Sequence, residues 1–104
     1  MTYLIALFNL KAGASPDAYE AWARSTDIPT VRGLKSNAGF DVWKALSVRG
    51  SDKAPPYQYV ELITIADMDQ FGADVSTDLM KKVSGEFREF ADSPIFITCE
   101  KIEP

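Results

Sequence analysis

The sequence predicts an α+β fold of the ferredoxin-like βαββαβ type, with an antiparallel sheet. Three observations support this fold. Four segments have the apolar alternation or the short apolar run of β-strands, two segments carry helix-start signals, and the order is strand, helix, strand, strand, helix, strand. The 104 residues are enough for one core and too few for two, so we expect a single domain over residues 1–104.

The first strand and helix are predicted from the opening third of the chain. Residues 2–10 are apolar on both alternating faces, and a strand of this kind has to be covered on both sides. Ser15 followed by Pro16 is typical of a helix start. Pro29 lacks an N–H and disfavours helical geometry at Ile28, so we expect the helix to end there and a short turn to follow.

The middle of the chain predicts a hairpin. Residues 40–48 and 57–65 alternate as strands, and residues 49–56 between them are the most polar and turn-rich stretch. Consecutive strands joined by such a loop pair in antiparallel fashion.

The last third predicts a helical region and a final strand. Asp67 with Gln70 three positions later is a capping box, and the polar cluster at residues 76–78 is expected to break the helix in two. Residues 91–94 are predicted to end the second part, and residues 95–102 to form the last strand.

The predicted sheet has one uncovered face. Both helices of this fold cover the same side, so about half of the first strand and part of the last remain on the bare side. The resulting apolar patch would exceed the roughly 300–600 Å² of the largest patches on monomers. We therefore expect a two-fold homodimer packed sheet to sheet, which forms a dimeric α+β barrel.

The composition excludes several function classes. The chain has no histidine, and its only cysteine is Cys99. Zinc sites normally use Cys and His, and a serine nucleophile needs a base such as His. No glycine pattern could cradle a phosphate. We therefore expect a protein that uses neither a metal nor an organic cofactor.

Charge and hydropathy exclude two kinds of partner. The net charge is −4, and the scattered Lys and Arg residues offer no footprint for nucleic acid. No stretch approaches the roughly 20 apolar residues of a membrane span, and no basic leader precedes the apolar start. A single cysteine fits a reducing compartment. We expect a cytoplasmic protein that binds neither nucleic acid nor membrane.

Four segments resemble the HapK/RedY-like family, and the resemblance covers essentially the whole chain. The segments are residues 1–11, 15–32, 55–61 and 67–71. The resemblance implies a small dimeric α+β barrel that acts in antibiotic or pigment biosynthesis, as in clusters for prodigiosin-like pyrrole and indole compounds. It further implies a cyclisation or a related tailoring step. Many enzymatic relatives in the wider barrel group place a His at the end of the first helix, where this chain has Asp27.

Two carboxylates are the candidate catalytic groups. Asp27 could move a proton if an apolar pocket raised its pKa, or it could cap a helical turn. Glu61 lies at the centre of a strand beside Tyr59, where a buried carboxylate is costly unless paired. It is either an acid or base, or the partner of Lys44 or Arg49 in an ion pair.

Further candidates would bind or orient the substrate. Tyr59 and Arg24 could orient it or stabilise developing charge. Aromatic side chains could stack on a flat heteroaromatic ligand, although core or dimer-interface packing also explains each of them. These aromatic candidates are Tyr3, Trp22, Phe40, Trp43 and Tyr57.

Three functions fit these residues. The first is a cofactor-free cyclase or condensation enzyme that binds a hydrophobic aromatic intermediate between helices and sheet, with Asp27 and Glu61 exchanging protons. The second is a cofactor-independent monooxygenase. The third is a non-catalytic carrier that shields a reactive intermediate.

Overall fold

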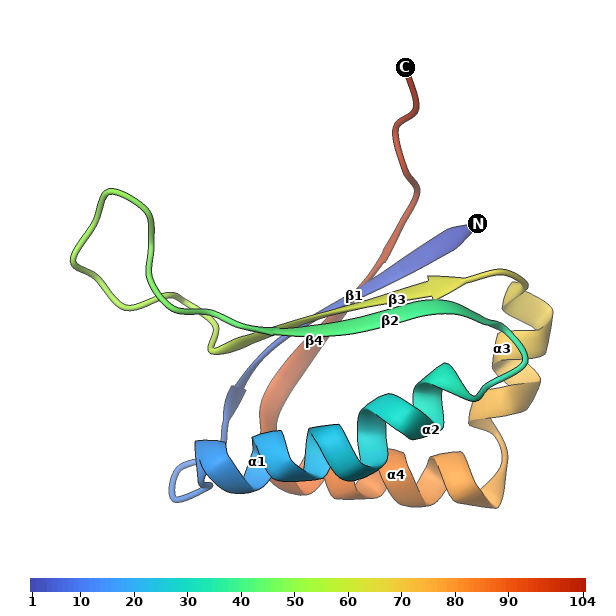
Figure 1. The fold of residues 1–104 in the computed structure, drawn as a ribbon, viewed down its shortest axis with the longest axis horizontal. Coiled ribbons are helices and arrows are strands. Elements are labelled where there is room, and N and C mark those ends of the chain that lie inside the picture. Colours follow the sequence, from blue (N-terminus) through green and yellow to red (C-terminus); the bar gives the residue numbers. More distant parts are fainter.

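The computed structural model describes residues 1–104, and it confirms the predicted element order (Figure 1). One antiparallel sheet of strand order β2-β3-β1-β4 carries the helices on a single face. The strands are β1 (Thr2–Leu10), β2 (Asn37–Lys44), β3 (Tyr59–Ile65) and β4 (Ala91–Cys99). The helical segments are α1 (Pro16–Trp22), η1 (Ala23–Asp27), α2 (Ile28–Arg32), α3 (Met68–Val75) and α4 (Asp78–Phe90). None of the helices is long and apolar enough to cross a membrane.

The first helical region does not end before Pro29, contrary to the prediction. η1 is a π-helical segment in which the N–H of Ile28 donates to the carbonyl of Ala23, five residues back. Asp27 and Ile28 keep right-handed helical dihedrals. Pro29 then falls in the first turn of α2, where an N–H has no intrahelical partner to lose. A Pro that would break a continuous α-helix is tolerated here because a new helical phase starts beside it.

The strand boundaries also differ from the prediction. β2 starts three residues earlier and ends at Lys44, because it pairs along the whole length of β3. β3 starts at Tyr59. The predicted end of the second helical region at residues 91–94 is confirmed, since α4 ends at Phe90. The last strand differs, because β4 already starts at Ala91 and ends at Cys99, whereas residues 95–102 were predicted. A register shift in the pairing with β1 accommodates residues 91–94, with Ser93 in the left-handed region at φ 47°.

The second helical region is broken where the sequence predicted. The carboxylate of Asp67 accepts from the backbone N–H groups of Asp69 and Gln70, and Thr77 caps α4. The capping box is incomplete, since the Gln70 side chain donates to Asp74 instead (Nε2 to Oδ1, 2.7 Å). Asp74 also accepts from the backbone N–H and the hydroxyl of Ser36, so α3 is tied to the turn before β2.

The helix-side face of the sheet is filled in three rows, which the strand register defines. The first row holds Lys44, Tyr59 and Phe8, and an aromatic cluster with Tyr19 and Phe87 packs on it. The third row holds Phe40, Ile63 and Leu4, with a smaller cluster of Val31, Phe40 and Met80 above it. The middle row holds Val42, Glu61, Ala6 and Phe96. The middle row therefore places a carboxylate between two apolar clusters.

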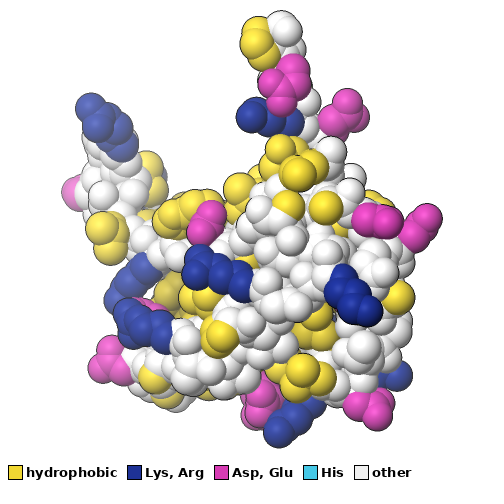
Figure 2. Space-filling view, turned by 45° about the vertical axis from the view of Figure 1, so that its right-hand side comes forward, with side chains coloured by type: hydrophobic (Ala, Val, Ile, Leu, Met, Phe, Trp, Pro, Cys, Tyr) yellow, Lys and Arg dark blue, Asp and Glu magenta, His cyan; other side chains and the backbone are white.

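The opposite face of the sheet carries no helix (Figure 1). Trp43, Ile95 and Ile97 point to this side and remain 48, 42 and 44% exposed. Figure 2 shows hydrophobic side chains at the surface between two projecting segments, the β2–β3 loop and the C-terminal tail. An apolar surface of this kind is typical of a protein–protein interface. We expect a second copy of the chain to cover it.

A charge in the middle of this face tests the expected dimer. Ile97→Glu would bury an unpaired carboxylate at the interface, which costs several kcal/mol. We expect analytical ultracentrifugation to show a wild-type dimer and a dissociation constant raised roughly 100-fold or more by the substitution. Leu79→Glu, on the exposed side of α4, is the matched control. A wild-type protein that sediments as a folded monomer at micromolar concentration would contradict the expectation.

Candidate functional site

A cavity of about 180 Å³ lies between the helices and the sheet. Its walls are mostly apolar and come from β1, β2, β3, β4, α3, α4 and the η1–α2 segment. Asp27 and Glu61 are the two titratable side chains that line it. The structure therefore brings both predicted catalytic carboxylates to one cavity, beside the predicted aromatic residue Phe40. An apolar cavity with a few convergent polar groups is the common form of a small-molecule site.

Asp27 points into this cavity because of the π-helical segment. Tyr19, Ala23, Asp27 and Val31 are all buried at a strict interval of four residues. In a regular α-helix, residues four apart differ by about 40° in direction around the helix axis. The last of the four side chains would therefore no longer face the sheet. The wider π turn restores the phase and keeps all of them against the sheet. Asp27 is thus 5% exposed at the end of η1.

The capping alternative for Asp27 is wrong. Its backbone is helical rather than extended, and its side chain makes no capping hydrogen bond to α2. Burial raises the pKa of Asp27 to about 6. A carboxylate that neither caps nor pairs is available for chemistry in the cavity.

Glu61 is buried without an opposite charge. It is 5% exposed, and its cross-strand neighbours Ala6 and Val42 offer neither a charge nor a polar side chain. The predicted ion pair is wrong, because Lys44 Nζ binds Glu20 Oε2 at 3.1 Å and Arg49 lies in the exposed β2–β3 loop. Burial, and then the nearby charge of Asp27, raise the pKa of Glu61 to about 8.

The two carboxyl groups have different raised pKa values in one cavity. Near neutral pH the pair holds one proton, since two charges in one apolar cavity would repel each other. That proton belongs mainly to Glu61, whose pKa is the higher of the two. Carboxyls whose pKa values are pushed apart by their surroundings can serve as a general base and a general acid at the same pH.

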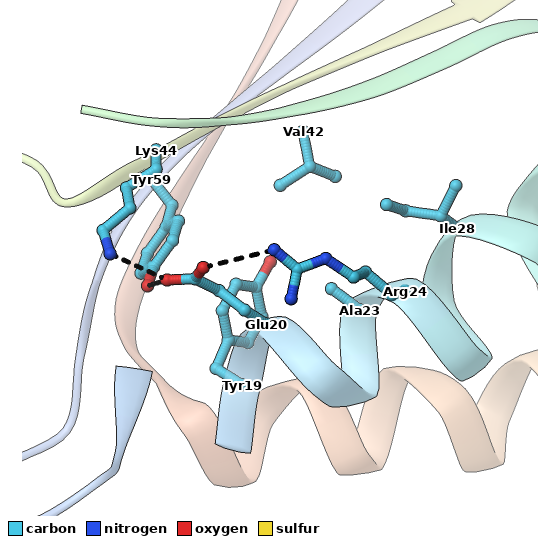
Figure 3. A pocket seen from close by; sticks show the side chains of 8 residues that line it. All are labelled: Tyr19, Glu20, Ala23, Arg24, Ile28, Val42, Lys44 and Tyr59. Atoms are coloured by element: carbon cyan, nitrogen blue, oxygen red, sulfur yellow. Dashed lines mark hydrogen bonds and ion pairs between the residues drawn. The ribbon is translucent and has the colours of Figure 1, made fainter. Parts of the chain in front are cut away.

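A second cavity of about 130 Å³ lies beside the first, and Figure 3 shows the residues around it. Here the carboxylate of Glu20 accepts from the Tyr59 hydroxyl at 2.7 Å and pairs with Lys44 and with Arg24, the latter at 3.6 Å. The Tyr59 hydrogen bond, more than the other contacts, lowers the pKa of Glu20. The structure therefore places Tyr59 and Arg24 at this neighbouring cavity, and neither of them lines the cavity of Asp27 and Glu61.

The remaining aromatic candidates lie apart from the carboxylates. Tyr3 lines a shallow hollow on the open sheet face, and Trp43 is exposed on the same face. Trp22 lies between α1 and α4, where its Nε1 donates to Glu86 at 3.2 Å. Tyr57 precedes β3 and lines none of the three cavities. Of the five aromatic candidates, only Phe40 reaches the cavity of the carboxylates.

Sequence reasoning missed Tyr19 as a functional candidate. It is fully buried in the aromatic cluster, and its ring also forms a wall of the smaller cavity. The repeated interval of four residues from Tyr19 to Val31 is the signal that could have found it. That interval departs from the mixed three-and-four spacing of an ordinary amphipathic helix and places Tyr19 and Asp27 on one face.

The raised pKa of Glu61 predicts how the free energy of unfolding depends on pH. Its pKa rises from 4.5 to about 8 on folding, so the native state binds the extra proton and the free energy of unfolding falls as pH rises between these values. We expect Glu61→Gln to match wild type near pH 4 and to be more stable by about 2–4 kcal/mol at pH 9. Urea unfolding across this pH range measures the difference. Glu89→Gln, at an exposed position, is the control. If the free energy of unfolding changed with pH equally in the two variants, Glu61 would not be a buried group with a raised pKa.

Comparison with known proteins supports a family assignment. Residues 2–102 match the family described as REDY-like protein HapK. The structure of HapK from Hahella chejuensis is 30% identical, with a TM-score of 0.77 over 100% of this chain and 95% of that chain. No curated protein matches.

Less similar structures share the fold. At3g17210 from Arabidopsis thaliana is 14% identical, with a TM-score of 0.82 over 100% of this chain and 98% of that one. SnoaB from Streptomyces nogalater, described as a cofactor-independent oxygenase, is 13% identical, with a TM-score of 0.73 over 99% and 94% of the two chains. A protein of unknown function from Thermobifida fusca, described as dimeric and ferredoxin-like, is 13% identical, with a TM-score of 0.72 over 94% and 88% of the two chains.

The order of elements, the sheet topology and the match over residues 2–102 together show that this chain belongs to the REDY-like HapK family.

Proposed function

We propose that this protein is a cofactor-free cyclase or condensation enzyme. Its substrate would be a hydrophobic aromatic intermediate in the biosynthesis of a pyrrole- or indole-containing pigment of the prodigiosin type. The observation that carries the proposal is the Asp27–Glu61 pair, two carboxyl groups without a cation partner in one apolar cavity. Membership of the HapK family supports the biosynthetic setting.

The pair supports a proton-transfer mechanism. Asp27 as a carboxylate removes the proton from the nucleophilic carbon or nitrogen of the substrate, and the Glu61 carboxyl protonates the electrophilic carbonyl oxygen. A bond then forms between the nucleophile and the carbonyl carbon. The proton gained by Asp27 returns to Glu61 when the product leaves, so the enzyme is restored without a co-reactant. Positioned general acids and bases each contribute about 10²–10⁴-fold to the rate.

The cavity walls would supply the rest of the catalysis. Phe40 and Phe87 offer flat apolar surfaces next to the carboxyl groups. Holding both reacting ends of a substrate in such a space removes much of the entropic part of the barrier. The exclusion of water strengthens the electrostatic effect of each carboxyl group.

A homodimer is compatible with this site. The uncovered face of the sheet is opposite to the face that carries the cavity, so a second copy packed there leaves the cavity accessible (Figure 1). The T. fusca protein of the same fold is described as dimeric, which supports the proposal for this chain.

Neutral isosteres test the proton-transfer roles. Pyrrole and indole substrates that carry a carbonyl group and a nucleophilic ring carbon are incubated with the purified protein, and the products are identified by mass. We expect Asp27→Asn and Glu61→Gln each to lower turnover by roughly 10²-fold or more. Asp41→Asn, an exposed carboxylate on β2, is the matched control and should turn over at the wild-type rate.

The outcomes separate the three candidate functions. Loss of turnover in both cavity variants, with equal rates in air and under nitrogen, supports the cyclase. Turnover that requires oxygen and adds one oxygen atom to the product would favour the monooxygenase and contradict the proposal. Binding without any turnover by the wild-type protein would identify a carrier and would also contradict it.

A further inference from the structure

The cavity of Asp27 and Glu61 opens on one side, between β4 and α4. Among the residues that line it, Phe96 is the exposed one, at 53%, whereas Asp27, Phe40 and Glu61 are buried. Phe96 belongs to β4, an edge strand of the sheet. Its ring lies next to that of Phe87 on α4, with centroids 6.3 Å apart. Phe96 therefore stands at the mouth of the cavity, with part of its ring against α4 and part in solvent.

The enclosed part of this site is small. Its volume of about 180 Å³ is little more than the roughly 150 Å³ that encloses one benzene molecule in an engineered cavity. Pockets that enclose a whole drug-sized ligand measure about 300–1,000 Å³. A ligand larger than one compact ring system must therefore leave part of its structure outside, at the mouth.

The middle row of the sheet leads from Glu61 to this mouth. Ala6 pairs with Glu61 on one side and with Phe96 on the other, so the three side chains lie on one face. Ala6 contributes only a methyl group, so no bulky side chain of this row separates the carboxyl group from the ring. Neighbouring strands lie about 4.8 Å apart, which puts β3 and β4 roughly 10 Å apart here.

The expected dimer would leave Phe96 accessible. Phe96 is on the face of the sheet that carries the helices, and we expect the second copy on the opposite face (Figure 1). A ligand can therefore reach the Phe96 ring in the dimer as well as in a single copy.

We propose that Phe96 is the outer part of the substrate site, and that it holds a planar apolar group projecting from the cavity, roughly 10 Å from Glu61. The inference rests on the proposed function, because it takes the cavity of Asp27 and Glu61 as the place where the substrate reacts. The reacting ring occupies the enclosed space, and the projecting group lies against the exposed part of the Phe96 ring. Phe96 is then a specificity-determining residue, which favours elongated molecules over compact ones and fixes which end of the molecule enters.

Two indole probes of different length test the proposal. Indole fits the enclosed space, whereas 2-phenylindole carries a second planar group along its long axis. We expect the wild type to bind 2-phenylindole more tightly than indole. Phe96→Ala should weaken binding of 2-phenylindole roughly 5- to 20-fold and change binding of indole by less than about 2-fold, because only the longer probe reaches the mouth. Equilibrium dialysis measures both dissociation constants. Leu79→Ala, which removes an exposed apolar side chain of α4 outside the cavity, is the matched control.

Further measurements separate contact with the ligand from a structural role. Phe96→Tyr keeps a flat ring and should retain the preference for the longer probe, whereas Phe96→Leu keeps apolar bulk without a flat ring and should lose part of it. Phe96→Ala should sediment like the wild type. A Phe96 that served only packing or the interface would change the melting temperature or the dissociation constant of the dimer, and not the ratio of the two probe affinities.

The outcomes also distinguish this inference from the proposed function. An equal effect of Phe96→Ala on both probes, no effect on either, or tighter wild-type binding of indole than of 2-phenylindole would overturn the role of Phe96. Loss of turnover in Asp27→Asn and Glu61→Gln would still support the proton-transfer mechanism in each of these cases. Selective loss of the longer probe, in a protein without any turnover, would support the inference and contradict the cyclase. A wild-type protein that binds neither probe would count against both.

Discussion

The desolvation of two carboxyl groups is the constraint on which the site depends. Asp27 and Glu61 are each 5% exposed, and neither has a cation within reach. A buried charge without a partner is costly, so each group keeps its proton to a higher pH than usual, and the pKa values rise to about 6 for Asp27 and about 8 for Glu61. Packing elsewhere has to offset this cost, and the buried aromatic cluster around Phe8 and Tyr59 provides such packing.

The fold produces this environment through two local features. On the sheet, strand register puts Glu61 in the middle row, with apolar clusters in the rows on either side. On the helices, the π-helical segment η1 keeps Asp27 in phase with the buried residues before and after it. π-Helical segments are frequent at functional sites because they hold side chains where a regular helix would not. Natural proteins commonly give up stability at such sites in return for activity.

Charge segregation completes the arrangement. The cations that could have neutralised the cavity are held at its neighbour, where Lys44 and Arg24 share the carboxylate of Glu20. The Tyr59 hydroxyl also donates to this carboxylate, so the ion cluster is satisfied within itself. The cavity with Asp27 and Glu61 is consequently free of positive charge, and its carboxyl groups influence mainly each other and whatever binds there.

The sequence by itself determined the order of the elements, the strand alternation that buries Glu61, the helix starts at Ser15 and Asp67 and the helix break at residues 76–78. These follow from local periodicity and capping. Sequence reasoning failed at Pro29, where a π-helical phase change removes the expected break. It also failed at the start of the last strand, which begins at Ala91 because a register shift lets Ala91 and Asp92 pair with β1. Only the tertiary structure decided that Lys44 pairs with Glu20 and that Trp22 and Trp43 do not line the cavity to which Phe40 belongs. These partners are distant along the chain, and their pairing depends on register and helix phase, which are set by the simultaneous packing of both layers.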